Sequence, residues 1–138
     1  MDNNLQIAID GPASSGKGTV ARRVAKALNF AYIDTGAMFR AVAWNARELG
    51  IPLHDGVRLG EAIKAMDFRF DWNGDILRLS LNGEDITDQI RTETVGADAS
   101  DVAVHPQVRE ALLQRQRHLA ASGGVVMDGR DIGSVVLP

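Results

Sequence analysis

The stretch Gly11-Pro12-Ala13-Ser14-Ser15-Gly16-Lys17-Gly18-Thr19 decides the fold. It has the spacing Gly-x4-Gly-Lys, in which small residues let the backbone wrap a phosphate with its amides pointing inward. The apolar run 5–9 before it predicts a buried strand, and apolar residues at helical spacing predict a helix over 17–28. A helix that begins near Lys17 points its positive end at an anion. Residues 11–19 are therefore predicted to hold a nucleoside triphosphate, with Lys17 on its β- and γ-phosphates.

The residue after Lys17 is Gly18, where many such loops carry a Ser or Thr that ligates Mg²⁺. Because Mg²⁺ readily keeps several waters, we expect it to be held here by phosphate oxygens and water. Thr19 is placed to contact a phosphate. The alternative is a glycine-rich turn that joins a strand to a helix without binding anything. The flanking strand and helix favour the phosphate loop.

Two further regions complete the predicted architecture. A strand over 30–33 and a helix over 37–49 continue the strand–helix order that is typical of a parallel α/β sheet. The same pattern returns near the end of the chain, with a helix from 106 to about 121 and a strand over 125–127. Between them, residues 67–72 and 76–81 alternate polar and apolar residues, and the Asn-Gly pairs at 73–74 and 82–83 are hairpin signals. We predict an α/β fold: a P-loop NTPase core with a parallel sheet and a small antiparallel β insertion at about 67–87.

Composition excludes several classes of protein. The 138 residues carry a formal net charge of −3 without a long basic run, which argues against a nucleic-acid partner. The absence of cysteine excludes disulfides and thiolate metal sites. No apolar run approaches the roughly 18 residues of a membrane span, and residues 1–4 lack the features of a signal peptide. A cytoplasmic protein without a membrane or nucleic-acid partner is expected.

Polar residues follow two other predicted strands. Asp34 and Thr35 come directly after one, with Arg40 a turn into the next helix, and Asp128 follows another. Ligands of an open α/β sheet bind at the carboxyl edge of its strands, so these residues are candidates for a second substrate. Asp128 resembles a Walker-B acid, which orients Mg²⁺ or its waters. The alternative makes Thr35 a helix cap and Arg40 a solvated surface residue.

The chain resembles the bacterial cytidylate kinases from its first strand to its last residue. The phosphate loop alone is shared with many unrelated proteins, whereas the final motif together with the β insertion is much more specific. The motifs that carry the resemblance are 11–19, Asp34-Thr-Gly-Ala-Met-Phe-Arg40, Asn82-Gly-Glu-Asp85, Ile90-Arg-Thr92, Val108-Arg-Glu110 and Asp128-Gly-Arg-Asp-Ile-Gly-Ser-Val-Val136.

The resemblance implies transfer of a phosphoryl group from ATP to CMP or dCMP with Mg²⁺, in pyrimidine nucleotide metabolism, by a protein that is monomeric at full length. The residues that it assigns to catalysis are Lys17, Arg40 and Arg130. Those that it assigns to CMP are Asp34, Thr35, Arg40, Ser100, Arg109, Arg130 and Asp131, with Asp128 on the metal through water. It divides the chain into a P-loop core, 1–36 and 105–138, and a monophosphate-binding region, 37–104.

Two departures qualify the resemblance. Phe39 stands where many family members carry Tyr, and the family's chain runs well past Pro138 into further strands and a lid. We therefore treat the core as lacking its C-terminal part, and expect residues 1–138 alone to bind nucleotide weakly and not to turn over.

Two rival functions stay open from the sequence. One is a kinase of another small acceptor, such as AMP or a shikimate-like compound. The other is a non-catalytic P-loop nucleotide-binding module. A GTPase-like module of that kind commonly reads guanine with Asn-Lys-x-Asp, a motif that this chain lacks.

Overall fold

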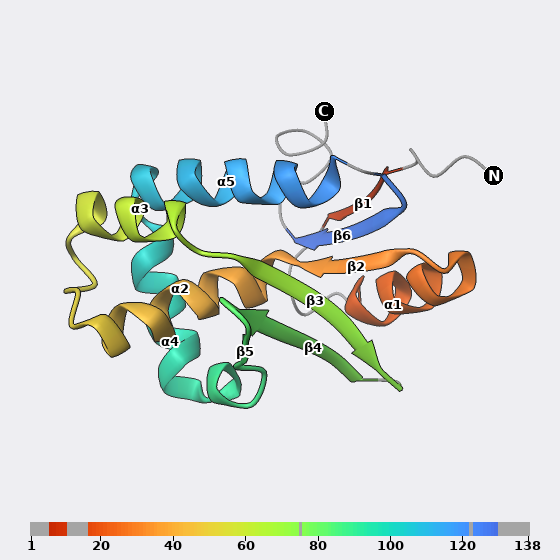
Figure 1. Ribbon diagram of the computed structural model, residues 1–138, viewed down its shortest axis with the longest axis horizontal. Helices are drawn as coiled ribbons and strands as arrows, with labels where there is room; N and C mark the ends of the chain where they lie inside the picture. Colours follow the sequence, from red (N-terminus) through yellow and green to blue (C-terminus); the bar gives the residue numbers. More distant parts are fainter. Residues whose placement is uncertain (1–5, 11–16, 75, 122, 130–138) are drawn as a thin grey trace. The chain divides into compact units, whose positions relative to one another are not determined.

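The computed structural model describes residues 6–10, 17–74, 76–121 and 123–129 (Figure 1). The chain divides into two units. Unit 1 comprises residues 1–36 and 116–138, and unit 2 comprises residues 37–115. The arrangement is mixed α/β, with a parallel three-stranded sheet in unit 1 and a small antiparallel sheet in unit 2. The predicted fold class is confirmed.

The parallel sheet of unit 1 contains β1 (Gln6–Asp10), β6 (Val125–Gly129) and β2 (Ala31–Asp34), in that spatial order (Figure 1). All three strands lie where the apolar runs predict them, with bounds that differ by one or two residues. In register, β6 places Asp128 beside Asp34 of β2 and beside Ile9 of β1. Every residue of β6 is buried, as expected of a strand with a neighbour on each side.

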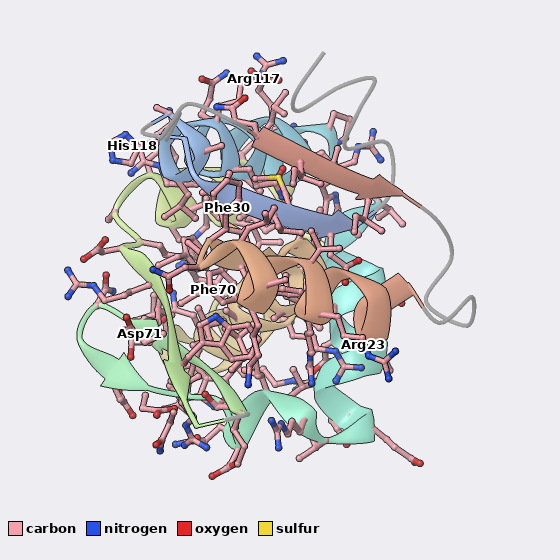
Figure 2. All side chains as sticks on the ribbon, turned by 90° about the vertical axis from the view of Figure 1, so that its right-hand side faces the viewer. Arg23, Phe30, Phe70, Asp71, Arg117 and His118 are labelled. Atoms are coloured by element: carbon pink, nitrogen blue, oxygen red, sulfur yellow. The ribbon has the colours of Figure 1, made fainter. Side chains whose placement is uncertain are left out.

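Helix α1 (Lys17–Leu28) has the predicted bounds and packs against β6 and β2. It ends at Asn29, whose φ of 55° is a left-handed conformation that asparagine tolerates, and the Phe30 amide closes the end on the Ala25 carbonyl at 2.8 Å. Arg22, Arg23 and Lys26 are exposed on the polar face (Arg23 is labelled in Figure 2). Ala25 faces the core and is fully buried.

Unit 2 is mainly helical. Its described helices are α3 (Gly56–Lys64), the 3-10 helix η2 (Gln89–Arg91) and α4 (Glu93–Ala103), together with the larger part of two helices that it shares with unit 1. The shared helices are α2 (Thr35–Leu49), which belongs to unit 2 from Ala37 on, and α5 (Pro106–Ala120), which belongs to it as far as Arg115. The sequence pattern predicts α2 and α5 but not α3 and α4. Each missed helix has a side-chain cap: Asp55 accepts from the Arg58 amide at 3.1 Å, and Thr92 from the Val95 amide at 3.2 Å. None of the described helices is long and apolar enough to cross a membrane.

The predicted β insertion is an antiparallel meander of β3 (Phe68–Asn73), β4 (Ile76–Leu81) and β5 (Glu84–Asp85). Asn82 and Gly83 have φ values of 52° and 86° between paired Leu81 and Glu84, as the second Asn-Gly signal predicts. The first signal is displaced by one residue. Asn73 does not take the predicted positive φ but ends β3 opposite Ile76, so the turn begins at Gly74, whose φ is 62°.

An ion pair joins β4 to β5 at the meander. The Arg78 Nε donates to Asp85 Oδ2 at 2.8 Å, and the Thr87 amide donates to Asp85 Oδ1 at 3.0 Å. These bonds lower the pKa of Asp85 from its ordinary value of 3.8 to about 2. A depressed carboxyl pKa stabilises the fold above the unfolded-state value, and this contribution is lost as the pH falls from about 4 to about 2.

We therefore expect Asp85→Asn to lower the urea midpoint of unfolding at pH 6, and the difference from wild type to shrink as the pH falls below 4. Urea titrations at pH 6, 4 and 3 measure this difference. The neighbouring exposed Glu84 provides the control, because Glu84→Gln leaves the ion pair intact. A difference between Asp85→Asn and wild type that stays constant across these pH values would contradict the assignment.

Candidate active site

The predicted phosphate loop has the frame that its function requires. Strand β1 ends at Asp10 and α1 begins at Lys17, so the loop residues connect the carboxyl edge of the sheet to a helix N-terminus. The first turn of α1 carries no acidic side chain that would compete with an anion for its amides. The residues predicted to wrap the phosphates, 11–16, lie outside the described residues, whereas Gly18 and Thr19 belong to the first turn of α1.

Two carboxylates lie side by side at the carboxyl edge of the sheet. Asp34 is the last residue of β2, Asp128 is the next-to-last residue of β6, and the two are register partners. Partners in parallel strands project their side chains from the same face. Asp128 is buried, with 4% of its surface exposed. Asp128 is thus placed at the edge where its predicted role requires it, and Asp34 is its direct neighbour.

Tyr32 makes a contact with Asp128 that sequence reasoning missed. Its hydroxyl donates to Asp128 Oδ2 at 2.5 Å, and the tyrosine is 2% exposed. Burial is the main cause that raises the pKa of Tyr32 above its ordinary value, followed by the hydrogen bond to Asp128 and the charges of Asp128 and Asp34, while Arg22 acts in the opposite sense. The phenol therefore stays protonated and acts as a donor. The sequence offers only a general signal for this contact, which is that a buried Tyr hydroxyl usually has a hydrogen-bond partner.

Thr35 begins α2, and Asp34 directly precedes it. The contacts of Thr35 differ from those of the helix cap that the sequence left open as an alternative. Thr35 is the first residue of the helix, is buried, and donates from Oγ1 to the main-chain oxygen of Asp128 at 2.9 Å. Asp34 precedes the helix, and its Oδ1 lies 3.3 Å from the position that a Cβ on Gly36 would take. A glycine at 36 therefore leaves room for this carboxylate. Binding of a phosphate by Thr35 stays a prediction.

Arg40, in unit 2, is half-buried rather than a solvated surface residue. Its Nη1 donates to the Ile90 carbonyl at 2.9 Å and lies 3.5 Å from the Thr92 carbonyl, so the guanidinium joins α2 to the segment that begins α4. A Cβ on Gly96 would lie 3.0 Å from Nη2 of Arg40. Arginine has five N–H donors, so these contacts leave donor capacity for a ligand.

Ser100 and Arg109 are brought to the same end of α4. Ser100 lies on the last turn of that helix, and Nη1 of Arg109, from α5, donates to the carbonyls of Ala103 and Val104 at 3.2 and 3.4 Å. Both side chains are exposed. A cation at this position satisfies carbonyls that the helix leaves without partners. Arg130 and Asp131, which are also predicted to bind CMP, lie outside the described residues.

An ion pair that the sequence did not predict positions α4. Asp98 of α4 is buried, with 6% of its surface exposed, and it accepts from Nε and Nη2 of Arg47 on α2, the second bond measuring 3.0 Å. The hydrogen bond from Arg47 lowers the pKa of Asp98, against the opposing effect of burial. A two-pronged arginine–carboxylate pair fixes both distance and direction.

The donor set fits Mg²⁺ only in part. The described residues contain no group of three or more His, Cys, Asp or Glu side chains that could hold a metal ion on their own. The Asp128 carboxylate lies at the carboxyl edge of the sheet, and Mg²⁺ is commonly held by one or two carboxylates together with substrate phosphates and water. The residues are therefore suited to a metal that arrives with a nucleotide.

The parallel sheet has a strand joined to a helix by a glycine-rich connection, with acidic residues at the same sheet edge, and a mainly helical unit is also present. This arrangement is that of an α/β core of the nucleoside monophosphate kinase type. The sequence model of the family described as cytidylate kinase matches residues 7–138. The chain belongs to the cytidylate kinase family, and the resemblance seen in the sequence is confirmed.

Curated relatives carry the same name. The cytidylate kinase of Pediococcus pentosaceus is 49% identical over 138 residues, which are the whole of this chain and 61% of that protein. The cytidylate kinase of Neisseria gonorrhoeae is 50% identical over 138 residues and is covered to 62%, and that of Geobacter sp. strain M21 is 45% identical over 137 residues and is covered to 59%. The chain spans about three fifths of the length of the curated relatives it matches.

Proposed function

We propose that the full-length protein transfers the γ-phosphoryl group of ATP to CMP or dCMP, giving CDP or dCDP and ADP. The observation that carries the proposal is the family match over residues 7–138, which includes a phosphate loop between β1 and α1. A cytoplasmic location and a monomeric state belong to the same proposal.

On the donor side, the loop 11–19 and Lys17 bind the triphosphate. Successive amides and the N-terminus of α1 face the phosphates, and the Lys17 ammonium adds a mobile point charge at the β- and γ-positions. Bound Mg²⁺ would neutralise charge between the β- and γ-oxygens, and Asp128 would hold it through water. The transition state carries most of its charge on equatorial oxygens, so positioned cations and amides lower the barrier.

On the acceptor side, Arg40 and Arg130 bind the phosphate of the monophosphate and orient one of its oxygens for in-line attack, with Thr35 and Asp34 beside it. Contacts to Ile90 and Thr92 support the proposed role of Arg40, because they fix the guanidinium before a ligand arrives. The attacking oxygen already carries negative charge, so the reaction needs no general base.

The base is read by Ser100, Arg109 and Asp131. The exocyclic amino group of cytosine is a donor that a carboxylate or hydroxyl accepts, and its ring N3 and O2 are acceptors that suit an arginine. Uracil places an oxygen where cytosine has the amino group, so it would face the Asp131 carboxylate unfavourably. The position of Ser100 and Arg109 at one end of α4 supports their joint assignment.

Replacement of Asp131 tests the reading of the base. We expect Asp131→Ala to narrow the preference for CMP over UMP by on the order of 1–3 kcal/mol, because the variant loses the acceptor for the amino group. Competition kinetics with both monophosphates measure the ratio of kcat/KM values. Unchanged discrimination would assign Asp131 to another task.

The function itself is tested by a coupled assay of ADP release with the full-length protein and Mg²⁺-ATP. CMP and dCMP are expected to support turnover, and AMP, UMP and shikimate to support much less. Preferential turnover of AMP or shikimate would favour the rival kinase. Nucleotide binding without turnover of any acceptor would favour the non-catalytic module.

A further inference from the structure

We propose that Tyr32 is a positioning residue for Asp128, whose carboxylate it holds in the orientation that receives Mg²⁺-ATP. The inference rests on the proposed function, since it assigns Tyr32 to the metal side of that site. Asp128 contacts the metal shell in this proposal, and Tyr32 acts through Asp128.

The sheet register makes the contact possible. Tyr32 is the register partner of Val126, two residues before Asp128, and residues two apart in a strand share a face. The tyrosine ring reaches along that face from β2 to β6, where its hydroxyl meets Asp128 Oδ2 at 2.5 Å. A shorter side chain at position 32 would not reach a residue two positions further along the neighbouring strand.

The main chain and side chain of Asp128 are both held by one short segment. Tyr32 donates to the carboxylate, and Thr35 donates to the main-chain oxygen at 2.9 Å. The β-ladder with β2 and β1 fixes the backbone of Asp128 on either side. The Tyr32 hydroxyl restricts the rotation of the carboxylate about its own side-chain bonds.

Charge explains why a neutral donor serves here. Asp34 and Asp128 are direct register partners, so two carboxylates lie beside each other where a polyphosphate has to bind. An arginine or lysine in place of Tyr32 would neutralise Asp128 and compete with the metal. A phenol donates one hydrogen bond without adding a positive charge of its own, which suits a carboxylate that contacts Mg²⁺ through water.

A merely structural role predicts different behaviour. A buried hydroxyl needs a partner in any case, and its removal would then reduce stability without altering metal dependence. Thr87 provides the matched control, because it is also a buried hydroxyl, 5% exposed, and accepts from the Leu79 amide at 2.8 Å within the meander.

The experiment uses the full-length protein as wild type, Tyr32→Phe, Asp128→Asn, the double variant and Thr87→Val. Calorimetry measures the affinity for ATP with Mg²⁺ and with EDTA, and the ratio of the two affinities is the metal increment. We expect Tyr32→Phe to reduce this increment on the order of 10-fold, as for other outer-shell partners of metal ligands, without changing the affinity for ATP in EDTA.

Two further comparisons test whether this effect of Tyr32→Phe depends on Asp128. In the Asp128→Asn background, Tyr32→Phe should cause no additional loss of the metal increment. In EDTA, the shifts of the urea midpoint caused by the two substitutions should be non-additive, because they change the two partners of one hydrogen bond. Thr87→Val should lower the urea midpoint and leave the metal increment unchanged.

The outcomes separate the inference from the proposed function. If Tyr32→Phe behaves like Thr87→Val, or if its effect adds to that of Asp128→Asn, Tyr32 does not position Asp128 for the metal. If Asp128→Asn leaves the metal increment intact, the metal role of Asp128 is wrong and the role of Tyr32 falls with it. If the expected binding pattern appears but CMP is not phosphorylated, the positioning role stands and the proposed function fails.

Discussion

A full-length Lys17→Ala variant should lose about 10²–10³-fold or more in kcat, the scale expected when a charge-stabilising donor is removed from a transition state. Lys17 is the only cation in the loop 11–19 and stands where the loop enters α1. Backbone amides remain in the variant, but their dipoles are fixed and cannot follow the charge that moves between the β- and γ-positions.

The coupled assay of ADP release with CMP and Mg²⁺-ATP measures this loss. Lys26→Ala is the matched control, because it removes another lysine from the exposed face in the last turn of α1. Near-normal turnover of Lys17→Ala, or an equal loss of turnover in Lys26→Ala, would contradict the assignment of the loop to phosphate binding.

The largest expected loss of stability belongs to Met127. This residue is fully buried in β6, between Ala8 of β1 and Ile33 of β2 in register. Met127→Ala removes three heavy atoms from the centre of the sheet and should cost about 2–5 kcal/mol of unfolding free energy, the transfer and cavity cost of such a truncation.

Urea unfolding of the full-length protein, monitored by circular dichroism, gives the difference. Leu28→Ala removes the same number of heavy atoms from the end of α1, where the leucine is 40% exposed, and should cost much less. Equal losses for the two variants would show that β6 is not the centre of the core of unit 1.

Local signals predicted the frame of the site. Strand β1, the glycine-rich connection and α1 are encoded within about 25 consecutive residues, and each of the three sequence signals supports the other two. The Asn82-Gly83 turn is similarly local, since both residues have to accept a positive φ. At Asn73-Gly74 the turn begins one residue later than the dipeptide predicts, because Asn73 pairs with Ile76 at the end of β3.

The sequence pattern did not predict helices α3 and α4, and the buried face of each contains residues other than large apolar ones. Two of the four buried residues of α3 are Gly56 and Gly60, and a Cβ on Gly60 would lie 3.2 Å from the Gln107 carbonyl oxygen. The buried face of α4 includes Asp98, whose charge is balanced by Arg47. A close backbone approach in α3 and a paired charge in α4 therefore take the place of part of the apolar surface.

The contacts around the candidate site could not be read from spacing. Tyr32 and Asp128 are 96 residues apart in sequence, and Arg47 and Asp98 are 51 apart. Each pair depends on the register or packing of elements that only the folded chain brings together. A side chain type, such as a buried tyrosine, indicates that a partner exists but does not identify it.

The entry into β6 has a consequence for how this family can change length. Gly123 and Gly124 have φ values of 74° and 63°, and the Gly124 carbonyl accepts from the Ala31 amide at 2.9 Å, which fixes the pairing of β6 with β2. Side chains alternate between faces with a period of two, so insertion or deletion of one residue here would turn every side chain of the strand to the opposite face. Such a lineage could retain a hydrogen-bonded sheet yet present Met127 or Gly129 where the carboxylate belongs. Evolution can therefore change neither the number of residues at this turn nor the two glycines with positive φ without a cost to the strand.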